Sequence, residues 1–193
     1  MISFSLIFIG HLFGSNTSAM IVCKLMGLTD PKTAGSHNPG ATNVLRLHGK
    51  NAAALTLIGD VLKGVFPVLI AHYFSDSDLI IGLTGLAAFL GHLYPIFFRF
   101  KGGKGVATLI GVLSATHWIL GLGFVLIWLL VALLFRYSSL SALTASACMP
   151  ILSYFFLGSS EFIISNTIMV ILLFWRHRSN ICNLLSGTES KLG

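Results

Sequence analysis

Small hydrogen-bonding residues and one arginine are concentrated between Gly35 and Arg46, a segment that reads GSHNPGATNVLR. Gly35, Pro39 and Gly40 interrupt regular structure, whereas Ser, Thr and Asn side chains donate hydrogen bonds and cap helices. If a helix begins near Pro39, Thr42 and Arg46 share one face of it. Hydroxyls, backbone N–H groups and a guanidinium together favour a receptor for phosphate or another oxyanion. An ordinary capped loop between two helices is the alternative.

A second candidate segment, Lys101 to Gly105, reads KGGKG. It places two ammonium groups around glycines that let the backbone approach an anion closely. It then enters a predicted helix at Val106, whose N-terminus favours negative charge. It is not a Walker A motif, because Lys104 is followed by glycine and not by Ser or Thr. A basic loop held by anionic lipid is the alternative.

Two further polar segments offer groups suited to phosphate. The first is Tyr137 to Ser139 (YSS), and the second is Arg176 to Arg178 (RHR) together with Asn180. A simple helix cap could explain the first segment, and an anchor at the membrane interface could explain the second.

Several catalytic motifs are missing from the sequence. No histidine is followed five residues later by Asp or Glu, so the H-x-x-x-x-D pair of soluble-type acyltransferases is absent. There is also no G-x-S-x-G elbow, no H-E-x-x-H and no metal-ligand cluster, so we expect no metal and no cofactor. Asp60 and Glu189 are the only acids well placed near the predicted cytoplasmic half. The sequence therefore favours catalysis by positioning and charge stabilisation, with the substrate supplying its own base.

Composition indicates the kind of element that must position these groups. The 193 residues are 55% hydrophobic and only 9% charged, whereas a soluble domain carries about 25% charged residues. We therefore expect one integral membrane domain over residues 1–193, all-α and built as a polytopic transmembrane helix bundle. The opening stretch lacks a basic n-region and a signal cleavage site, so it is interpreted as a retained span.

The predicted apolar segments are separated by short polar ones. The first, Ile2 to Leu28, contains a Gly10–Gly14 pair that permits close helix contact. The second contains Asp60 and Lys63, which can pair at i and i+3 either as a functional site or as a structural salt bridge. We expect the other apolar segments at the following ranges: Ala52–Phe74, Leu79–Phe98, Val106–Phe135, Ala142–Leu157 and Phe162–Trp175.

Charge placement decides how often residues Val106–Phe135 cross the membrane. This stretch is too long for one straight helix across a core of ~30 Å, and Thr116, His117 and Gly121 mark a break. All 12 lysines and arginines except Lys24 and Lys63 lie in four polar segments. Those segments share one side only if the stretch crosses twice. The positive-inside rule therefore favours seven spans, with the N-terminus outside and the C-terminus cytoplasmic. Six spans are the alternative.

The remaining composition excludes other classes. The three cysteines, Cys23, Cys148 and Cys182, are scattered and form no metal or disulfide pattern. The net charge of +6 sets topology in a membrane protein and needs no nucleic acid partner.

Taken together, these residues closely resemble the bacterial acyl-phosphate-dependent glycerol-3-phosphate acyltransferases. The first family motif, S-x-N-x-G-A-T-N-x-x-R, is matched from Ser36 to Arg46, and the second, G-H-x-x-P-x-F-x-x-F-K-G-G-K-G-V-A-T, from Gly91 to Thr108. The resemblance continues in Y-S-S-L from Tyr137 and in the D-x-x-K-G of Asp60 to Gly64. The tail matches R-H-x-x-N-I-x-R-L-x-x-G-x-E at these positions: Arg176, His177, Asn180, Ile181, Leu184, Gly187 and Glu189.

Four positions, in three places along the chain, depart from the family pattern. Asn183 stands where arginine is usual, which puts one phosphate contact of the tail in doubt. His37 stands where glycine is common, and Asn16-Thr17 replaces an Ile-Pro. The last change concerns helix shape and not chemistry.

The resemblance implies transfer of a fatty acyl group from acyl phosphate to the 1-hydroxyl of glycerol 3-phosphate, giving lysophosphatidic acid and phosphate. It implies a bacterial inner-membrane location, a site facing the cytoplasm, membrane lipid around the chain and a partner enzyme that makes acyl phosphate. Ser36, Arg46 and Lys104 are the expected catalytic residues. The expected substrate-binding residues are the following: Asn38, Gly40, Thr42, Asn43, His92, Lys101, Gly102, Gly103, Gly105, Thr108, Ser138, Ser139, His177, Asn180, Gly187 and Glu189.

A transporter of phosphate esters is the rival interpretation, because it too needs basic groups and polar residues in the membrane. It predicts an internal repeat and pore-lining residues on both faces. The sequence has no evident repeat, and its predicted outer turns are short and acidic. A non-catalytic subunit would leave the four polar segments unexplained.

Overall fold

The computed structural model describes residues 2–192, and within that range it contains helices and no strand. The all-α prediction is therefore confirmed. In chain order the helices are α1 (Ile2–Gly14), α2 (Ser18–Leu25), α3 (Ala41–His48), α4 (Lys50–Phe74), α5 (Asp78–Leu93), the 3₁₀ turn η1 (Ile96–Phe98), α6 (Val106–Thr116), α7 (Trp118–Phe135), α8 (Ser138–Leu157), α9 (Ser160–Arg176) and α10 (Arg178–Leu185).

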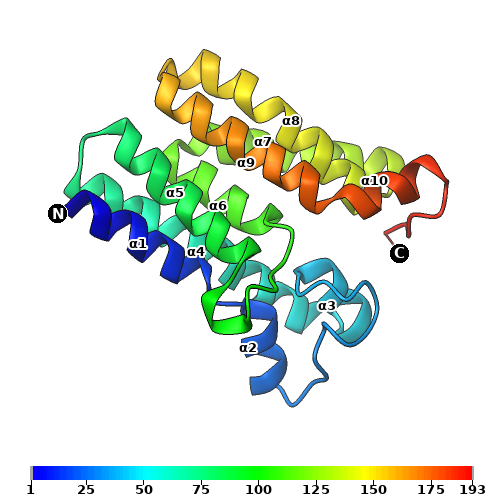
Figure 1. Ribbon diagram of the computed structural model, residues 1–193. Coiled ribbons are helices and arrows are strands. Elements are labelled where there is room, and N and C mark those ends of the chain that lie inside the picture. The colour runs from blue at the N-terminus through cyan, green and yellow to red at the C-terminus, as the bar shows by residue number, and fades with distance from the viewer. Residues whose placement is uncertain (1, 193) are drawn as a thin grey trace.

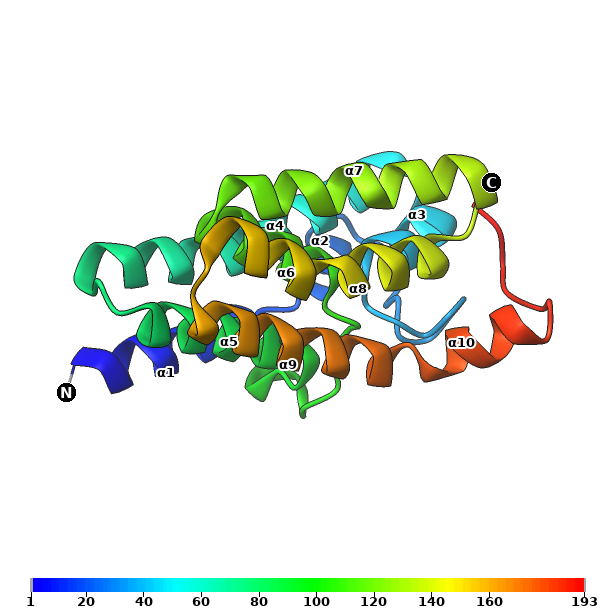
Figure 2. The same ribbon diagram turned by 90° about the horizontal axis from the view of Figure 1, so that it is seen from above.

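The longer helices lie lengthwise beside one another and form an elongated bundle (Figure 1). α1 packs on α5, α4 packs on α6, and α7 packs on α8, which in turn contacts α9. In both views the two ends of the chain lie at opposite ends of the bundle, and α3 and α10 lie away from the N-terminus (Figure 2). The short helices that carry the polar segments are thus brought to one end.

The sequence suggested one span over Ile2–Leu28, but this segment forms two helices in the structure. α1 ends at Gly14, and α2 leaves it at an angle of 44°. The side chains of Ser15 and Asn16 end α1, because Ser15 Oγ donates to the His11 carbonyl at 2.8 Å and Asn16 Nδ2 donates to the Phe13 carbonyl at 3.2 Å. Local side-chain bonds of this kind compete with the helical ladder.

The long apolar stretch breaks where the sequence predicted. α6 ends at Thr116, His117 is extended with φ −159° and ψ 122°, and α7 begins at Trp118. Residues Val106–Phe135 therefore form two helices. α6 has 11 residues, which at 1.5 Å per residue reach only about 16 Å.

Two of the segments predicted as loop and tail contain helices. α3 lies inside the polar loop, and α10 lies inside the polar tail. Both have eight residues, and both are too short and too polar to show an apolar pattern. The predicted spans at α4, α5, α8 and α9 agree with the structure to within four residues at each end, apart from Leu79–Phe98, which divides into α5 and η1.

Large apolar side chains project from the long helices. Leu133 in α7 is 79% exposed and Phe155 in α8 is 73% exposed, as expected of surfaces that face lipid. Within the described range, four helices are long and apolar enough to cross a membrane, or five if the bent α1–α2 pair counts as one span. This count does not reach seven, because α6 is short and α9 has only 17 residues.

Glycine contacts bring α1 and α5 unusually close. A Cβ added at Gly10 would lie 2.6 Å from the Thr84 carbonyl oxygen, and one added at Gly14 would lie 1.9 Å from that of Ala88. Only hydrogen fits at either position, so the predicted Gly10–Gly14 contact surface is confirmed.

Candidate active site

One cavity of about 340 Å³ collects most of the sequence-predicted site residues. Its lining combines polar residues with apolar ones. The predicted residues that line it are the following: Ser36, Asn38, Gly40, Thr42, Asn43, Arg46, His92, Lys104, Gly105, Ser138, Ser139, His177, Asn180 and Glu189. The volume lies within the usual range for small-molecule sites, roughly 300–1,000 Å³.

Five predicted residues do not reach this cavity: Lys101, Gly102, Gly103, Thr108 and Gly187. Lys101 is exposed outside it, and Gly187 forms a turn with φ +72° in the tail. Thr108 is fully buried in α6, and its backbone carbonyl lies against Gly64 of α4. These five residues therefore lie outside the cavity lining, and the substrate contact that the sequence suggested for them stays a prediction.

The loop before α3 is shaped by a buried asparagine. Asn43 Oδ1 accepts the Ser36 N–H at 2.9 Å, and its Nδ2 donates to the carbonyls of Pro31 at 2.8 Å and Ala34 at 3.2 Å. The Asn43 side chain is thereby committed to the loop, and it fixes the backbone of Ser36. His37 adopts φ +55°, a left-handed conformation that glycine adopts without strain, which accounts for the glycine common in the family pattern.

α3 presents the predicted face to the cavity. Gly40 precedes its first turn in an extended conformation, and Thr42 and Arg46 lie one helical turn apart. Thr42 Oγ1 lies 3.3 Å from Ser138 Oγ, and Arg46 donates to the Ser190 carbonyl at 3.2 Å. These bonds connect α3 to the start of α8 and to the C-terminal tail.

The glycine loop is held from both sides by protein groups. The N–H groups of Gly102 and Gly103 donate to the carbonyls of Leu93 and His92, each at 3.2 Å. The guanidinium of Arg176 donates to the carbonyls of Gly102 at 2.9 Å and Gly103 at 3.1 Å. The peptide groups of the two glycines are therefore satisfied internally, and the loop delivers Lys104 and Gly105 to the cavity.

Lys104 begins a chain of hydrogen bonds between residues that line the cavity. Its Nζ donates to Asn180 Oδ1, and Asn180 Nδ2 donates to Glu189 Oε1 at 2.7 Å. Ser139 Oγ donates to the same carboxylate oxygen at 2.6 Å. Burial lowers the pKa of the Lys104 ammonium, while the Glu189 carboxylate acts in the opposite direction.

Glu189 is also bonded by the residue that departs from the family pattern. Asn183 Nδ2 donates to Glu189 Oε2 at 3.3 Å. Asn183 is exposed and does not line the cavity. In this chain the residue therefore supports Glu189 and does not face the cavity itself.

His177 is positioned as a neutral hydrogen-bond acceptor. Its side chain is buried, and its Nδ1 lies 2.9 Å from the Leu173 carbonyl, which can only accept. Nδ1 therefore carries the hydrogen, and Nε2 keeps its lone pair. Burial lowers the pKa of His177 to about 4, so the ring is neutral at pH 7. A neutral ring with a free Nε2 suits a hydroxyl donor.

The cavity also receives a buried helix end and a buried acid. Val106 and Ala107 line it at the first turn of α6, where backbone N–H groups have no partner within the helix. Asp60 reaches it from α4, next to His92 of α5. An anion in the cavity would therefore meet the positive end of the α6 dipole.

The chain matches the family model described as glycerol-3-phosphate acyltransferase over residues 4–187. It is 53% identical over 183 residues to the glycerol-3-phosphate acyltransferase of Methylococcus capsulatus, covering 95% of this chain and 92% of that protein. It is 51% identical over 187 residues to that of Burkholderia ambifaria, covering 96% and 88% of the two chains. This chain belongs to the glycerol-3-phosphate acyltransferase family.

Solved structures extend the likeness to three dimensions. The crystal structure of PlsY (YgiH), an integral membrane glycerol 3-phosphate acyltransferase, in its glycerol 3-phosphate form is 39% identical to this chain, with a TM-score of 0.95. That match covers 100% of this chain and 96% of the other. The lysophosphatidic acid form gives 38% identity, a TM-score of 0.93 and the same coverage. This chain is therefore an integral membrane protein of the acyltransferase family.

Sequence reasoning on this acyltransferase missed two groups of cavity residues. The apolar wall comes from α4, α6 and α7: Leu57, Ile110, Val125, Trp128 and Leu129. α7 is apolar on every face, so no pattern distinguishes its cavity side from its lipid side. Arg176 was noted only as a phosphate-suited or interfacial group, and its contact with the glycine loop depends on how α9 packs.

Proposed function

We propose that this acyltransferase uses acyl phosphate as the donor and transfers the acyl group to the 1-hydroxyl of glycerol 3-phosphate, giving lysophosphatidic acid and phosphate. The observation that carries the proposal is the mixed lining of the cavity. Arg46 and Lys104 supply positive charge, and Trp128 and its apolar neighbours supply apolar surface. Acyl phosphate likewise combines an anionic head with an apolar chain.

The polar wall suits two phosphates and a developing oxyanion. Ser36, Arg46 and Lys104 would hold phosphate oxygens and stabilise the carbonyl oxygen as it gains charge. The free N–H groups at the start of α6 would add to that field. His177 Nε2, Asn180, Ser138 and Ser139 would orient the glycerol 3-phosphate hydroxyls.

The reaction needs no side-chain base in this scheme. The 1-hydroxyl oxygen attacks the carbonyl carbon of acyl phosphate, and the carbon–oxygen bond to phosphate breaks as the tetrahedral intermediate collapses. The hydroxyl proton passes to an oxygen of the acyl phosphate, which leaves as inorganic phosphate. The low pKa of about 4 at His177 makes this ring a weak base at pH 7 and supports an orienting role instead.

The arrangement of the chain supports seven crossings of a bacterial cytoplasmic membrane. The two ends of the chain lie at opposite ends of the bundle (Figures 1 and 2), which requires an odd number of crossings. With the positive-inside rule, the C-terminus and the cavity then face the cytoplasm. Residues 1–193 would form one membrane-embedded domain, supplied by a partner enzyme that makes acyl phosphate.

A donor comparison with purified protein tests this function. Palmitoyl phosphate or palmitoyl-CoA is supplied with glycerol 3-phosphate in lipidic mesophase, and lysophosphatidic acid is quantified. We expect product from palmitoyl phosphate and none, or far less, from palmitoyl-CoA. Turnover with palmitoyl-CoA alone would refute the proposed donor. Uptake of glycerol 3-phosphate into liposomes without any ester product would favour a transporter.

A further inference from the structure

A buried ion pair and a histidine lie at the cavity wall, where α4 meets the end of α5; together they are called the charge network. Lys63 Nζ lies 2.8 Å from Asp60 Oδ1, and His92 Nδ1 lies 3.9 Å from the same oxygen. All three side chains are at most 5% exposed. Burying charges in a membrane protein is costly, so such groups are kept where they serve a function.

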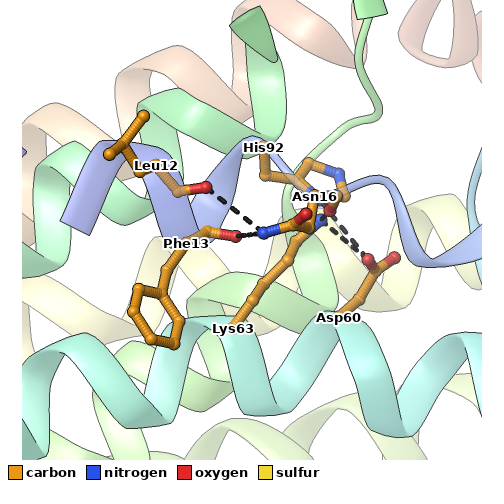
Figure 3. A network of polar contacts seen from close by, with 6 residues as sticks. All are labelled: Leu12, Phe13, Asn16, Asp60, Lys63 and His92. Atoms are coloured by element: carbon orange, nitrogen blue, oxygen red, sulfur yellow. Dashed lines mark hydrogen bonds and ion pairs between the residues drawn. The ribbon is translucent and has the colours of Figure 1, made fainter. Parts of the chain in front are cut away.

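The lysine of this network is fixed by the break between α1 and α2. Lys63 Nζ donates to the Asn16 carbonyl at 2.6 Å, a group that the end of α1 leaves without a helical partner. Figure 3 shows Asn16, Lys63, Asp60 and His92 converging on one point. The Asn16 carbonyl thus holds the Lys63 ammonium in place, and Asp60 Oδ1 lies near both that ammonium and the ring of His92.

The His92 ring touches the glycine loop on its other edge. A Cβ added at Gly103 would lie 2.3 Å from His92 Nε2 and 3.0 Å from Cε1. The His92 carbonyl accepts the Gly103 N–H at 3.2 Å. His92 therefore contacts Gly103 with both its ring and its backbone, and the gap between them admits only hydrogen.

Arg176 closes the loop from the opposite side through the carbonyls of Gly102 and Gly103. The next residue along the chain is Lys104, whose Nζ reaches Asn180 in the cavity wall. A shift of Gly103 against the His92 ring would therefore move the Lys104 backbone. A displacement of about 1 Å can cost roughly 10²-fold in rate.

We propose that His92 is a positioning residue, which sets the place of Gly103 and hence of Lys104, and that the buried Asp60–Lys63 pair orients its ring. This replaces the substrate contact that the sequence suggested for His92. The inference rests on the proposed role of Lys104. It gives a positioning role to the charge network, which takes part in no step of the proposed reaction.

A double-mutant cycle tests the contact directly. Gly103→Ala places a methyl group against the ring, and we expect kcat/KM for lysophosphatidic acid formation to fall by about 10²-fold. His92→Asn removes Nε2 and Cε1 but keeps a polar group facing Asp60. The double variant should recover about tenfold over Gly103→Ala alone, because the two residues are coupled.

Gly102→Ala is the matched control. A Cβ there would lie 2.0 Å from the His92 carbonyl oxygen and 2.6 Å from that of Leu93, so no side-chain deletion can relieve it. His92→Asn should not rescue Gly102→Ala. Thermal midpoints in detergent separate misfolding from misplacement, because a purely structural role for His92 would lower the activity of His92→Asn only together with its midpoint.

Additive losses at Gly103, or equal rescue of both alanine variants, would overturn the proposal. If His92→Asn does not accumulate as folded protein, His92→Ala makes the same room and replaces it in the cycle. The cycle is measured with whichever acyl donor the wild-type protein uses. Failure of the proposed donor therefore shows in the wild type alone and is distinct from failure of the coupling.

Discussion

Lys104 and His177 meet the cavity with opposite hydrogen-bonding roles. Burial lowers the pKa of both groups below their ordinary values, which are 10.5 for lysine and 6.5 for histidine. The ammonium of Lys104 donates, whereas the neutral ring of His177 accepts at Nε2. A bound phosphate would favour the charged form of Lys104, so substrate binding and lysine protonation should reinforce each other.

The buried neutral His177 predicts a specific dependence of stability on pH. Above pH 6.5 the ring is neutral in both folded and unfolded chains. Between pH 6.5 and about 4 only the unfolded chain takes up the proton, so stability falls as pH falls, and below about 4 this loss ends. In His177→Gln the fall in thermal midpoint across this window should be smaller, as measured by thermal unfolding in detergent. An unchanged fall in midpoint for His177→Gln would show that the ring is not buried in its neutral form.

Residue types, together with the family resemblance, identified most of the polar residues that line the cavity, because Arg, Lys, Ser and Asn have few reasons to cluster in a chain with 9% charged residues. The same reasoning could not separate ligands from supports. Asn43 resembles a ligand in the sequence, yet its amide bonds the Pro31 and Ala34 carbonyls. Gly102 and Gly103 resemble a phosphate loop, yet their peptide groups face protein.

At the scale of elements, small residues and polar breaks fix how the helices meet. The α1–α5 contact depends on Gly10 and Gly14, and the α4–α6 contact depends on Gly64 and Gly111, where an added Cβ would lie within 2.4 Å of a backbone oxygen. The break at His117 was predictable from the length of the apolar stretch. The end of α1 rests on the local Ser15 and Asn16 bonds, whereas the donation from Lys63 to the Asn16 carbonyl comes from another helix and was not predictable.

Gly14→Ala should destabilise the bundle. The added methyl group would lie 1.9 Å from the Ala88 carbonyl oxygen, and backbone cannot move aside without separating α1 from α5. Overpacking of this kind typically costs about 1–3 kcal/mol, and the thermal midpoint in detergent measures it.

Gly123→Ala in α7 is the helical control, since its nearest contact is the flexible Leu152 side chain at 3.2 Å. It should change the midpoint far less. Equal midpoints for both variants would mean that α1 and α5 are not in close contact.

At the scale of the whole molecule, the polar segments gather at the end away from the N-terminus (Figure 1). The sequence predicted this gathering through charge parity and allowed for a helix beginning near Pro39, whereas α10 was too short to predict. The sequence could not predict which apolar residues line the cavity. Its apolar wall combines α4, α6 and α7, and nothing local marks these residues.

Cysteine labelling tests the orientation. Cys182 in α10 is exposed, so a variant that keeps it while Cys23 and Cys148 become alanine should react with an impermeant maleimide in inverted vesicles and not in intact cells. A cysteine placed at Ser77, between α4 and α5, in a background without native cysteines should react only from outside. Labelling of Cys182 from the outside would exclude the seven-crossing topology.

The most direct test of the central claim compares wild type with Lys104→Met in one assay. Palmitoyl phosphate and glycerol 3-phosphate are supplied, and phosphate and lysophosphatidic acid are measured together. We expect equal amounts of both products from wild type, and a parallel fall of about 10²–10³-fold in the variant, as for the loss of an oxyanion donor. Arg178→Ala, outside the cavity, should retain wild-type rates. Phosphate release without lysophosphatidic acid, or a Lys104→Met enzyme that keeps most of its activity, would contradict acyl transfer in this cavity.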